Sequence, residues 1–425
     1  MGRIDEQDFD EKRLARRQRR KRSQLIAYII LTVFVLAVLG GGAFGVHYLG
    51  SFAGKSKQSG DSAKESTTES TQEQVAVIET PEETVPEPEE MSQDDVLMEI
   101  VNSCIGDMTL EDKVASLFVI TPEQLTGVET VVKAGSGTQE SLSQYAVGGL
   151  VYSAKNIKSE SQIAEMMKST GDMSKYPLFT VIHEFSDDFS AITNSVGQLD
   201  MPEITDEETA YNAGATIAGA MFKYGFNMNL APDMDITDTG VLGSDAEKAG
   251  IMAAAFSRGM SESGMSACAY DFPVSADTLA GMATDEITKE ELIAGSYSVY
   301  KKAIEEGSLK AIMLSNVSLP QVVGDNTPVS LSNIMIQNEI RSELGFDGVV
   351  LTGALNEGAI TEYYTSDQAA IAAIRAGADM IYLPEDFKAA YDGLLAAVQA
   401  GDITEERINE SLTRIFRIKY ANRVE

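Results

Sequence analysis

Short apolar runs alternate with amphipathic stretches of helical length along the chain after residue 92. Each run is mostly apolar, which is typical of parallel β-strands that are buried on both faces. Helix-capping residues such as Thr109 and Thr288 precede two of the stretches in between. The predicted strands are Leu117–Ile120, Gly149–Tyr152, Leu178–Ile182, Met228–Ala231, Ala267–Tyr270, Ala311–Leu314, Gly348–Leu351 and Met380–Leu383.

Eight strands, each followed by a helix, predict a TIM (β/α)8 barrel over residues 93–425, an α/β fold whose active site lies at the carboxyl ends of the strands. A doubly wound open sheet is the alternative, because it uses the same elements. Thr288 is expected to cap a helix over Glu290–Ile304. Gly401 is expected to end the helix that contains Ala389–Val398.

The N-terminal 49 residues have a different pattern. Residues 1–23 form a basic tail, and an uncharged apolar run from Leu25 to Val46 follows it. A helix of that length rises roughly 33 Å, which is enough to cross a bilayer, so residues 24–49 are predicted to be a single transmembrane anchor. The basic flank places the N-terminus in the cytoplasm and the C-terminal domain outside the plasma membrane. A cleaved signal peptide is the alternative, although its apolar region usually has only ~7–15 residues.

Residues 50–92 are rich in Ser, Thr, Glu, Gln and Pro, which predicts a disordered linker that repels itself. The chain carries a net charge of −32, although its first 55 residues are net basic, so the outer domain is strongly acidic. Such a domain repels nucleic acid. The sequence has no glycine-rich phosphate loop, and its two cysteines and two histidines are far apart. We therefore expect no nucleotide, no metal and no other cofactor.

Six blocks beside the predicted strands form one ordered set: Met108–Val114, Gly148–Val151 with Asn156, Asn227–Pro232 with Asp235, Leu344–Val350, Ala376–Met380 and Pro384–Asp386. Together they resemble the family 3 glycoside hydrolases, and among these the single-domain β-N-acetylhexosaminidases. The resemblance covers nearly all of residues 93–425 and implies the TIM barrel. It also implies retaining hydrolysis, in which a carboxylate attacks the anomeric carbon while an acid protonates the leaving oxygen.

Both catalytic positions that the resemblance implies have changed. The nucleophile would be an Asp just past the seventh strand, where this chain has Gly353, which has no side chain to form a glycosyl ester. The acid/base would be a His after the fifth strand, where this chain has Ser275. A serine hydroxyl does not titrate usefully near neutral pH. Asp277, which resembles the Asp that holds that His, is retained, but no catalytic residue is predicted to be intact.

The residues that would bind the sugar have changed as well. The family's sugar-binding Lys and His correspond to Tyr270 and Asp271 in this chain. An Asp and an Arg on the loop after the third strand correspond to His183 and Asp188. Asp235 resembles a family residue that supports the barrel mouth. These residues remain candidates for lining the pocket, although most of their polar groups differ from those of the family.

Other side chains could replace the lost chemistry. Glu357 and Asp271 are the candidate carboxylates, and retaining geometry would require them to be about 5–5.5 Å apart. The simpler expectation for both is a solvated charge on a loop or at a helix start. His183 is a candidate general acid. Asp233 and Asp235 could form a metal pair, but hard cations need several converging oxygens, so a structural role is expected.

The sequence therefore predicts a membrane-anchored, extracellular pseudo-glycosidase. Its barrel mouth is expected to bind a cell-envelope glycan or an envelope protein. An active β-N-acetylhexosaminidase, or a related O-glycosyl hydrolase with a relocated carboxylate, is the first alternative. A structural spacer domain is the second.

Overall fold

The computed structural model describes residues 92–185, 191–192, 195, 197, 199, 201–237 and 240–421. The predicted basic tail and anchor, nearly all of the predicted linker, and Asp188 lie outside these residues. Within the described part of the chain, no helix is both long enough and apolar enough to cross a membrane.

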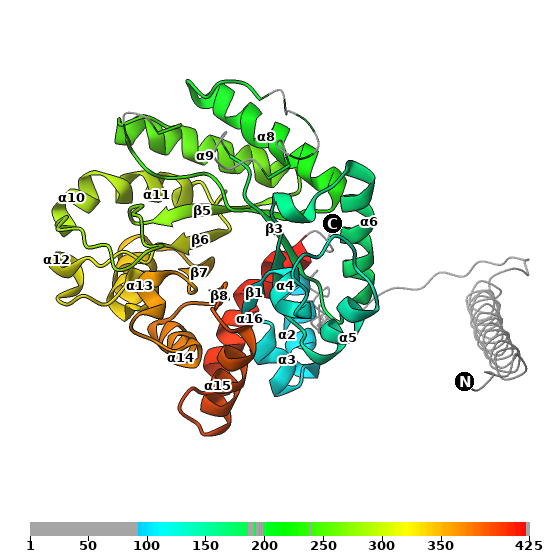
Figure 1. Ribbon diagram of the computed structural model, residues 1–425. Coiled ribbons are helices and arrows are strands. Elements are labelled where there is room, and N and C mark those ends of the chain that lie inside the picture. Colours follow the sequence, from blue (N-terminus) through cyan, green and yellow to red (C-terminus); the bar gives the residue numbers. More distant parts are fainter. Residues whose placement is uncertain are drawn as a thin grey trace, which may run out of the picture. The chain divides into compact units, whose positions relative to one another are not determined.

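Eight parallel strands close into a barrel that helices surround (Figure 1). The strands follow one another in chain order, and β1 pairs with β8 through Phe118 and Ile381. This pair excludes the open sheet and confirms the predicted eight-stranded α/β barrel. The strands are β1 (Phe118–Ile120), β2 (Gly149–Val151), β3 (Phe179–Ile182), β4 (Met228–Asn229), β5 (Ser266–Phe272), β6 (Ala311–Leu314), β7 (Val349–Ala354) and β8 (Met380–Tyr382).

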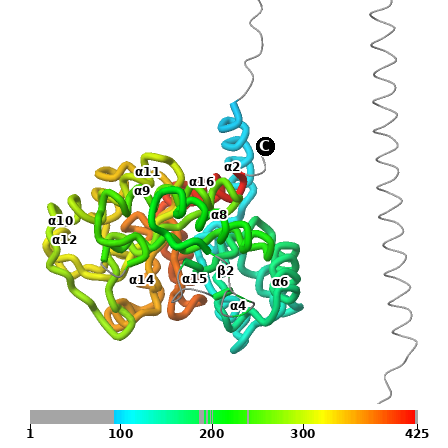
Figure 2. Tube along the Cα trace, turned by 90° about the horizontal axis from the view of Figure 1, so that it is seen from above, coloured from blue at the N-terminus to red at the C-terminus, as the bar shows by residue number. Residues whose placement is uncertain are grey.

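Helices follow the strands and form the outer layer of the barrel (Figures 1 and 2). Short 3-10 segments, η1 (Ala154–Asn156) and η2 (Val329–Leu331), and a π-helix, η3 (Ile334–Glu343), supplement them. The α-helices are α2 (Gln93–Asp107), α3 (Leu110–Ala115), α4 (Pro122–Thr126), α5 (Ser136–Gln144), α6 (Glu160–Met173), α8 (Glu207–Tyr224), α9 (Ala246–Glu262), α10 (Lys289–Ala294), α11 (Ser296–Glu305), α12 (Pro320–Val323), α13 (Gly358–Thr361), α14 (Ser366–Ala376), α15 (Phe387–Gln399) and α16 (Glu405–Tyr420).

The predicted helix caps are present. The hydroxyl of Thr109 accepts the N–H of Asp112 at 3.2 Å before α3, and Thr288 caps α10 in the same way. The single helix predicted after Thr288 was wrong in one respect, because Gly295 leaves the helical conformation and divides it into α10 and α11. Gly401 follows α15 with a φ of 79°, a left-handed conformation that glycine adopts readily, as predicted for a helix end.

Helices α8 and α9 pack with their backbones in contact. A Cβ atom on Gly214 would lie 2.2 Å from the carbonyl oxygen of Phe256, and one on Gly259 would lie 2.2 Å from the carbonyl oxygen of Tyr211. Each helix therefore presents a glycine to the backbone of the other. This close packing fixes the outer wall of the barrel beside β4 and β5.

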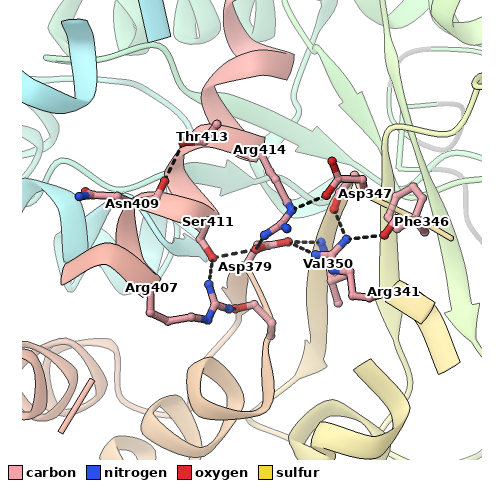
Figure 3. Close-up of polar contacts among 12 residues, drawn as sticks. Arg341, Phe346, Asp347, Val350, Asp379, Arg407, Asn409, Ser411, Thr413 and Arg414 are labelled. Atoms are coloured by element: carbon pink, nitrogen blue, oxygen red, sulfur yellow. Dashed lines mark hydrogen bonds and ion pairs between the residues drawn. The ribbon is translucent and has the colours of Figure 1, made fainter. Parts of the chain in front are cut away.

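A buried carboxylate ties the last helix to the amino-terminal end of the barrel (Figure 3). Asp379 immediately precedes β8 and is fully buried. It accepts hydrogen bonds from Arg341 at 2.6 Å and from the N–H of Val350 at 2.9 Å. From α16, the hydroxyl of Ser411 donates to it at 2.7 Å, and Arg414 lies 3.3 Å away. One buried negative charge is thus compensated by two guanidinium groups and two neutral donors.

Candidate functional site

The predicted nucleophile position lies in a closed part of the structure. Gly353 is near the end of β7, and its N–H donates to the hydroxyl of Ser330 at 2.8 Å. A Cβ atom there would lie 2.7 Å from the carbonyl oxygen of Leu314 and 2.9 Å from Oδ1 of Asn316. The Leu314 oxygen belongs to the backbone of β6 and cannot turn away. Gly353 therefore lacks a side chain and also lacks the space for one.

The predicted acid/base position lies on the loop after β5. Ser275 and Asp277 are both exposed there. The carboxylate of Asp277 accepts the N–H of Leu279 at 3.3 Å, so it supports its own loop. Thr278, one residue further, is buried and its hydroxyl points to Glu357. The structure therefore gives Asp277 a local role and makes Thr278 the residue that links this loop to the loop after β7.

Glu357 lies at the barrel mouth and immediately precedes α13 (Gly358–Thr361). Its Oε2 atom accepts hydrogen bonds from the hydroxyl of Thr278 at 2.5 Å and from the amide of Asn316 at 2.8 Å. The same amide also donates to the carbonyl oxygen of Ala354 at 2.8 Å. Residues after β5, β6 and β7 thus hold one carboxylate in place, and its Oε1 atom has no hydrogen-bond partner among the described residues.

Four carboxylates meet at this end of the barrel, and we call Asp233, Asp235, Asp271 and Glu357 the acidic cluster. Burial, followed by the charges of the other three carboxylates, raises the pKa of Asp271 well above its usual range. Burial raises the pKa of Asp233 to about 6, and the pKa of Asp235 also rises. The expectation of a solvated charge was wrong for Asp271, because β5 carries it into the barrel mouth, where protein encloses it.

Two aromatic rings lie beside the acidic cluster. The ring centroid of His183 is 4.8 Å from that of Tyr270, which places the residue after β3 against β5. Burial lowers the pKa of His183 to about 4, so its imidazole is neutral at neutral pH and does not suit a general acid there. Burial, and then the charge of Asp271, raises the pKa of Tyr270.

The aspartate pair after β4 forms a local turn. Oδ1 of Asp233 accepts the N–H of Asp235 at 2.9 Å. In the part of the chain that the structure describes, no group of three His, Cys, Asp or Glu residues could hold a metal ion. The structural role of Asp235 stays a prediction.

Sequence reasoning missed Asn316, whose amide donates to Glu357. It follows β6 at the barrel mouth, so its position was a usable signal. A pocket of about 760 Å³ lies at the opposite end, where Lys310, Asp347 and Arg414 are among its lining residues. Since TIM barrels carry catalysis at the carboxyl ends of their strands, we do not assign the active site to that pocket.

The raised pKa values predict an unusual dependence of stability on pH. An acid whose pKa is higher in the folded state binds its proton more tightly there than in the unfolded state. Its contribution to the free energy of unfolding is therefore largest below its unfolded-state pKa and is lost as the pH rises through its folded-state pKa. For Asp233 the pH range of this loss runs from 3.8 to about 6, and the free energy of unfolding should fall by about 2–3 kcal/mol across it. In Asp233→Asn, the free energy of unfolding measured in urea should no longer show this fall over the same pH range.

Asp277→Asn is the matched control for this experiment, because Asp277 is exposed on the same end of the barrel. Its pH profile should follow that of the unmodified protein. If the stability of Asp233→Asn falls with pH as steeply as that of the unmodified protein, the charge of Asp233 does not destabilise the fold.

Known proteins share both the sequence pattern and the fold. The family described as "Glycosyl hydrolase family 3 N terminal domain" matches residues 109–418. A beta-hexosaminidase of Idiomarina loihiensis is 30% identical over 287 residues, which cover 63% of this chain and 86% of the relative. A glycoside hydrolase family 3 beta-N-acetylglucosaminidase from Paenibacillus sp. str. FPU-7 superposes with a TM-score of 0.66 and 29% identity, over 75% of this chain and 63% of that one. This chain thus spans less than two thirds of that solved structure.

A third comparison concerns the fold alone. The structure of LpqI from M. tuberculosis superposes with a TM-score of 0.65 at 20% identity, over 75% of this chain and 96% of that chain.

The closed parallel barrel and the blocks at its strand ends define a glycoside hydrolase-like domain. The chain belongs to glycosyl hydrolase family 3, and the part described here is the family's N-terminal barrel domain.

Proposed function

We propose that this protein is a pseudo-glycosidase that binds a cell-envelope glycan at the barrel mouth and does not hydrolyse it. The observation that carries the proposal is the closed space at Gly353, where the backbone of Leu314 excludes any side chain. The exposed hydroxyl of Ser275 supplies no titrating acid in the loop after β5. The family resemblance implies a carboxylate and a titrating acid at these two positions, and this chain has neither. An envelope protein is the other partner considered for the same surface.

The proposal includes a place for the protein in the cell. Residues 24–49 would anchor it in the plasma membrane as a single span, with residues 1–23 in the cytoplasm. Residues 50–92 would be a flexible linker, and residues 93–425 would lie outside. The support is the long uncharged apolar run that follows a basic segment.

A relocated carboxylate supports a second candidate function, an active β-N-acetylhexosaminidase. Glu357 is held at the barrel mouth by Thr278 and Asn316, and its charge acts on the enclosed Asp271. Asp271 with a raised pKa would be the acid, and Glu357 the nucleophile. We prefer inactivity because the second candidate needs two carboxylates to take over both catalytic roles, whereas Gly353 has no space for a side chain and Ser275 supplies no titrating acid.

Covalent trapping tests the two candidates. The full-length protein is incubated with a mechanism-based inhibitor that forms a glycosyl ester, and its intact mass is measured. We expect no increase in mass. A sugar ester on Glu357 would overturn the pseudo-glycosidase and establish the second candidate. Calorimetry with cell-wall glycan fragments then tests binding. Heat of binding would exclude a structural spacer domain, and the absence of heat would overturn the glycan as the ligand.

Gly353→Asp should restore no hydrolysis, although it returns a carboxylate to the predicted nucleophile position. The new Cβ atom must displace the backbone of β6, and overpacking of this kind usually costs about 1–3 kcal/mol. Unfolding in urea and turnover of a chromogenic β-N-acetylglucosaminide are the measurements. Gly219→Ala on α8 is the control, since a Cβ there meets nothing within 4 Å and should not destabilise the fold. Measurable turnover by Gly353→Asp would show that the site is more intact than proposed.

A further inference from the structure

The barrel mouth has the charge of a site for a cation. The acidic cluster brings together four carboxylates, and three of them raise the pKa of the fourth, Asp271. No lysine or arginine of the described residues forms an ion pair with the cluster. A neutral N-acetyl sugar would bring no positive charge to the carboxylates of the cluster, whereas a cation would favour their ionised forms.

Asp271 is the part of the cluster that most needs a partner. Protein encloses its carboxylate, although the residue keeps a solvent-accessible edge. Among the described residues it has neither a hydrogen bond nor an ion pair. An enclosed carboxyl group without a partner is costly, and a bound cation within about 4–6 Å would favour its charged form. The Oε1 atom of Glu357 is a second acceptor that the protein does not use.

Two large apolar side chains are exposed at the rim next to the cluster. Leu279 is 74% exposed and Tyr363 is 61% exposed. The N–H of Gly358 donates to the carbonyl oxygen of Leu279 at 3.0 Å, which joins the loop after β5 to α13, and Tyr363 lies two residues after the end of α13. An exposed tyrosine ring offers a flat apolar face with a polar tip. A sugar ring has a matching apolar face, whereas a simple inorganic cation has none.

We propose that the barrel mouth binds an amino-sugar glycan with free amines, that is, de-N-acetylated glucosamine residues. The ammonium group would lie among the carboxylates of the acidic cluster, and the ring would pack against Tyr363. This inference rests on the proposed function, since it names the glycan that the same site takes. It adds a preference for free amines, whereas the solved relative from Paenibacillus is named for an acetylated sugar.

Calorimetry on the full-length protein tests the preference with two probes of equal length. These are the β-1,4-linked tetramer of glucosamine and the tetramer of N-acetylglucosamine. We expect the glucosamine tetramer to bind at least about tenfold more tightly, a difference of about 1.4 kcal/mol. Asp271→Asn and Glu357→Gln should each remove most of that difference. Tyr363→Ala should weaken both tetramers, because it removes packing and no charge.

Controls separate recognition from general attraction by an acidic protein. Glu305→Gln changes an exposed carboxylate on α11 and should leave both affinities unchanged. Asp233→Asn is a second variant of the cluster, in case Asp271→Asn does not fold. Tetralysine that binds as tightly as the glucosamine tetramer would overturn the sugar ligand. Equal or tighter binding of the acetylated tetramer would overturn the preference but leave glycan binding intact. Binding of neither tetramer would instead count against the proposed function itself.

Discussion

The full-length protein is expected to hydrolyse a chromogenic β-N-acetylglucosaminide on the order of a million-fold more slowly than an active family member, which is the loss that follows removal of a catalytic nucleophile. The reason is the backbone contact at Gly353, which excludes a carboxylate from the position that would attack the anomeric carbon. Ser275 compounds the loss, because a hydroxyl cannot protonate the leaving oxygen near neutral pH. Initial rates at saturating substrate are the measurement.

The beta-hexosaminidase of Idiomarina loihiensis is a suitable reference for this assay. Glu357→Gln is the informative variant, because it removes the only replacement carboxylate that Thr278 and Asn316 hold in place. If the unmodified protein turns over substrate at an ordinary rate and Glu357→Gln abolishes that turnover, the proposed inactivity is refuted and the chemistry is assigned to Glu357. A residual rate that the variant does not change would agree with the proposal.

Asp379→Asn is expected to lower the free energy of unfolding by about 3–5 kcal/mol, the usual cost of removing one partner from a buried ion pair. The substitution keeps the shape of the side chain but leaves Arg341 and Arg414 without the charge that they share. Arg341 is almost buried, with 12% of its side chain exposed, so water cannot replace the lost carboxylate. Urea unfolding followed by circular dichroism gives the free energy from the midpoint and slope.

Asp347→Asn is the matched control, since Asp347 pairs with the same Arg414 at 3.1 Å but has 79% of its side chain exposed. An exposed pair contributes at most about 1 kcal/mol. Asp379→Asn should therefore lower the free energy of unfolding several-fold more than Asp347→Asn does. Equal small losses would show that the network around Asp379 stabilises the barrel no more than a surface contact does.

The barrel could be predicted because its strands are buried on both faces. Such strands appear as apolar runs, and Ala311–Leu314 agrees with β6 at both ends. The ends of β5 and β7 were missed because polar or small residues continue them into the barrel mouth. β5 includes Asp271, and β7 continues to Ala354 beyond the predicted end at Leu351. Functional positions thus interrupt the apolar pattern where the strands reach the site.

The candidate site was predicted less completely than the fold. Gly353 and Ser275 could be singled out because each replaces a group whose chemistry is known. The contact between Thr278 and Glu357 joins residues from two loops, so no local pattern shows it. The enclosure of Asp271 also depends on side chains from several strands, because burial and neighbouring charges together set its pKa. The pattern of residues along one segment shows neither the contact between the two loops nor the enclosure of Asp271.

The pairing of β1 with β8 joins the beginning of the barrel to its end, and α16 must then dock beneath it through Arg414 and Ser411. Both steps require sequence that is made after the other seven strands. During synthesis the edges of β1 remain open, and such edges invite aggregation until the final strand arrives. Ring closure between distant segments is also slow, because its chain entropy must be overcome first. Maturation of this protein therefore depends on keeping the incomplete barrel soluble until β8 and α16 have been made.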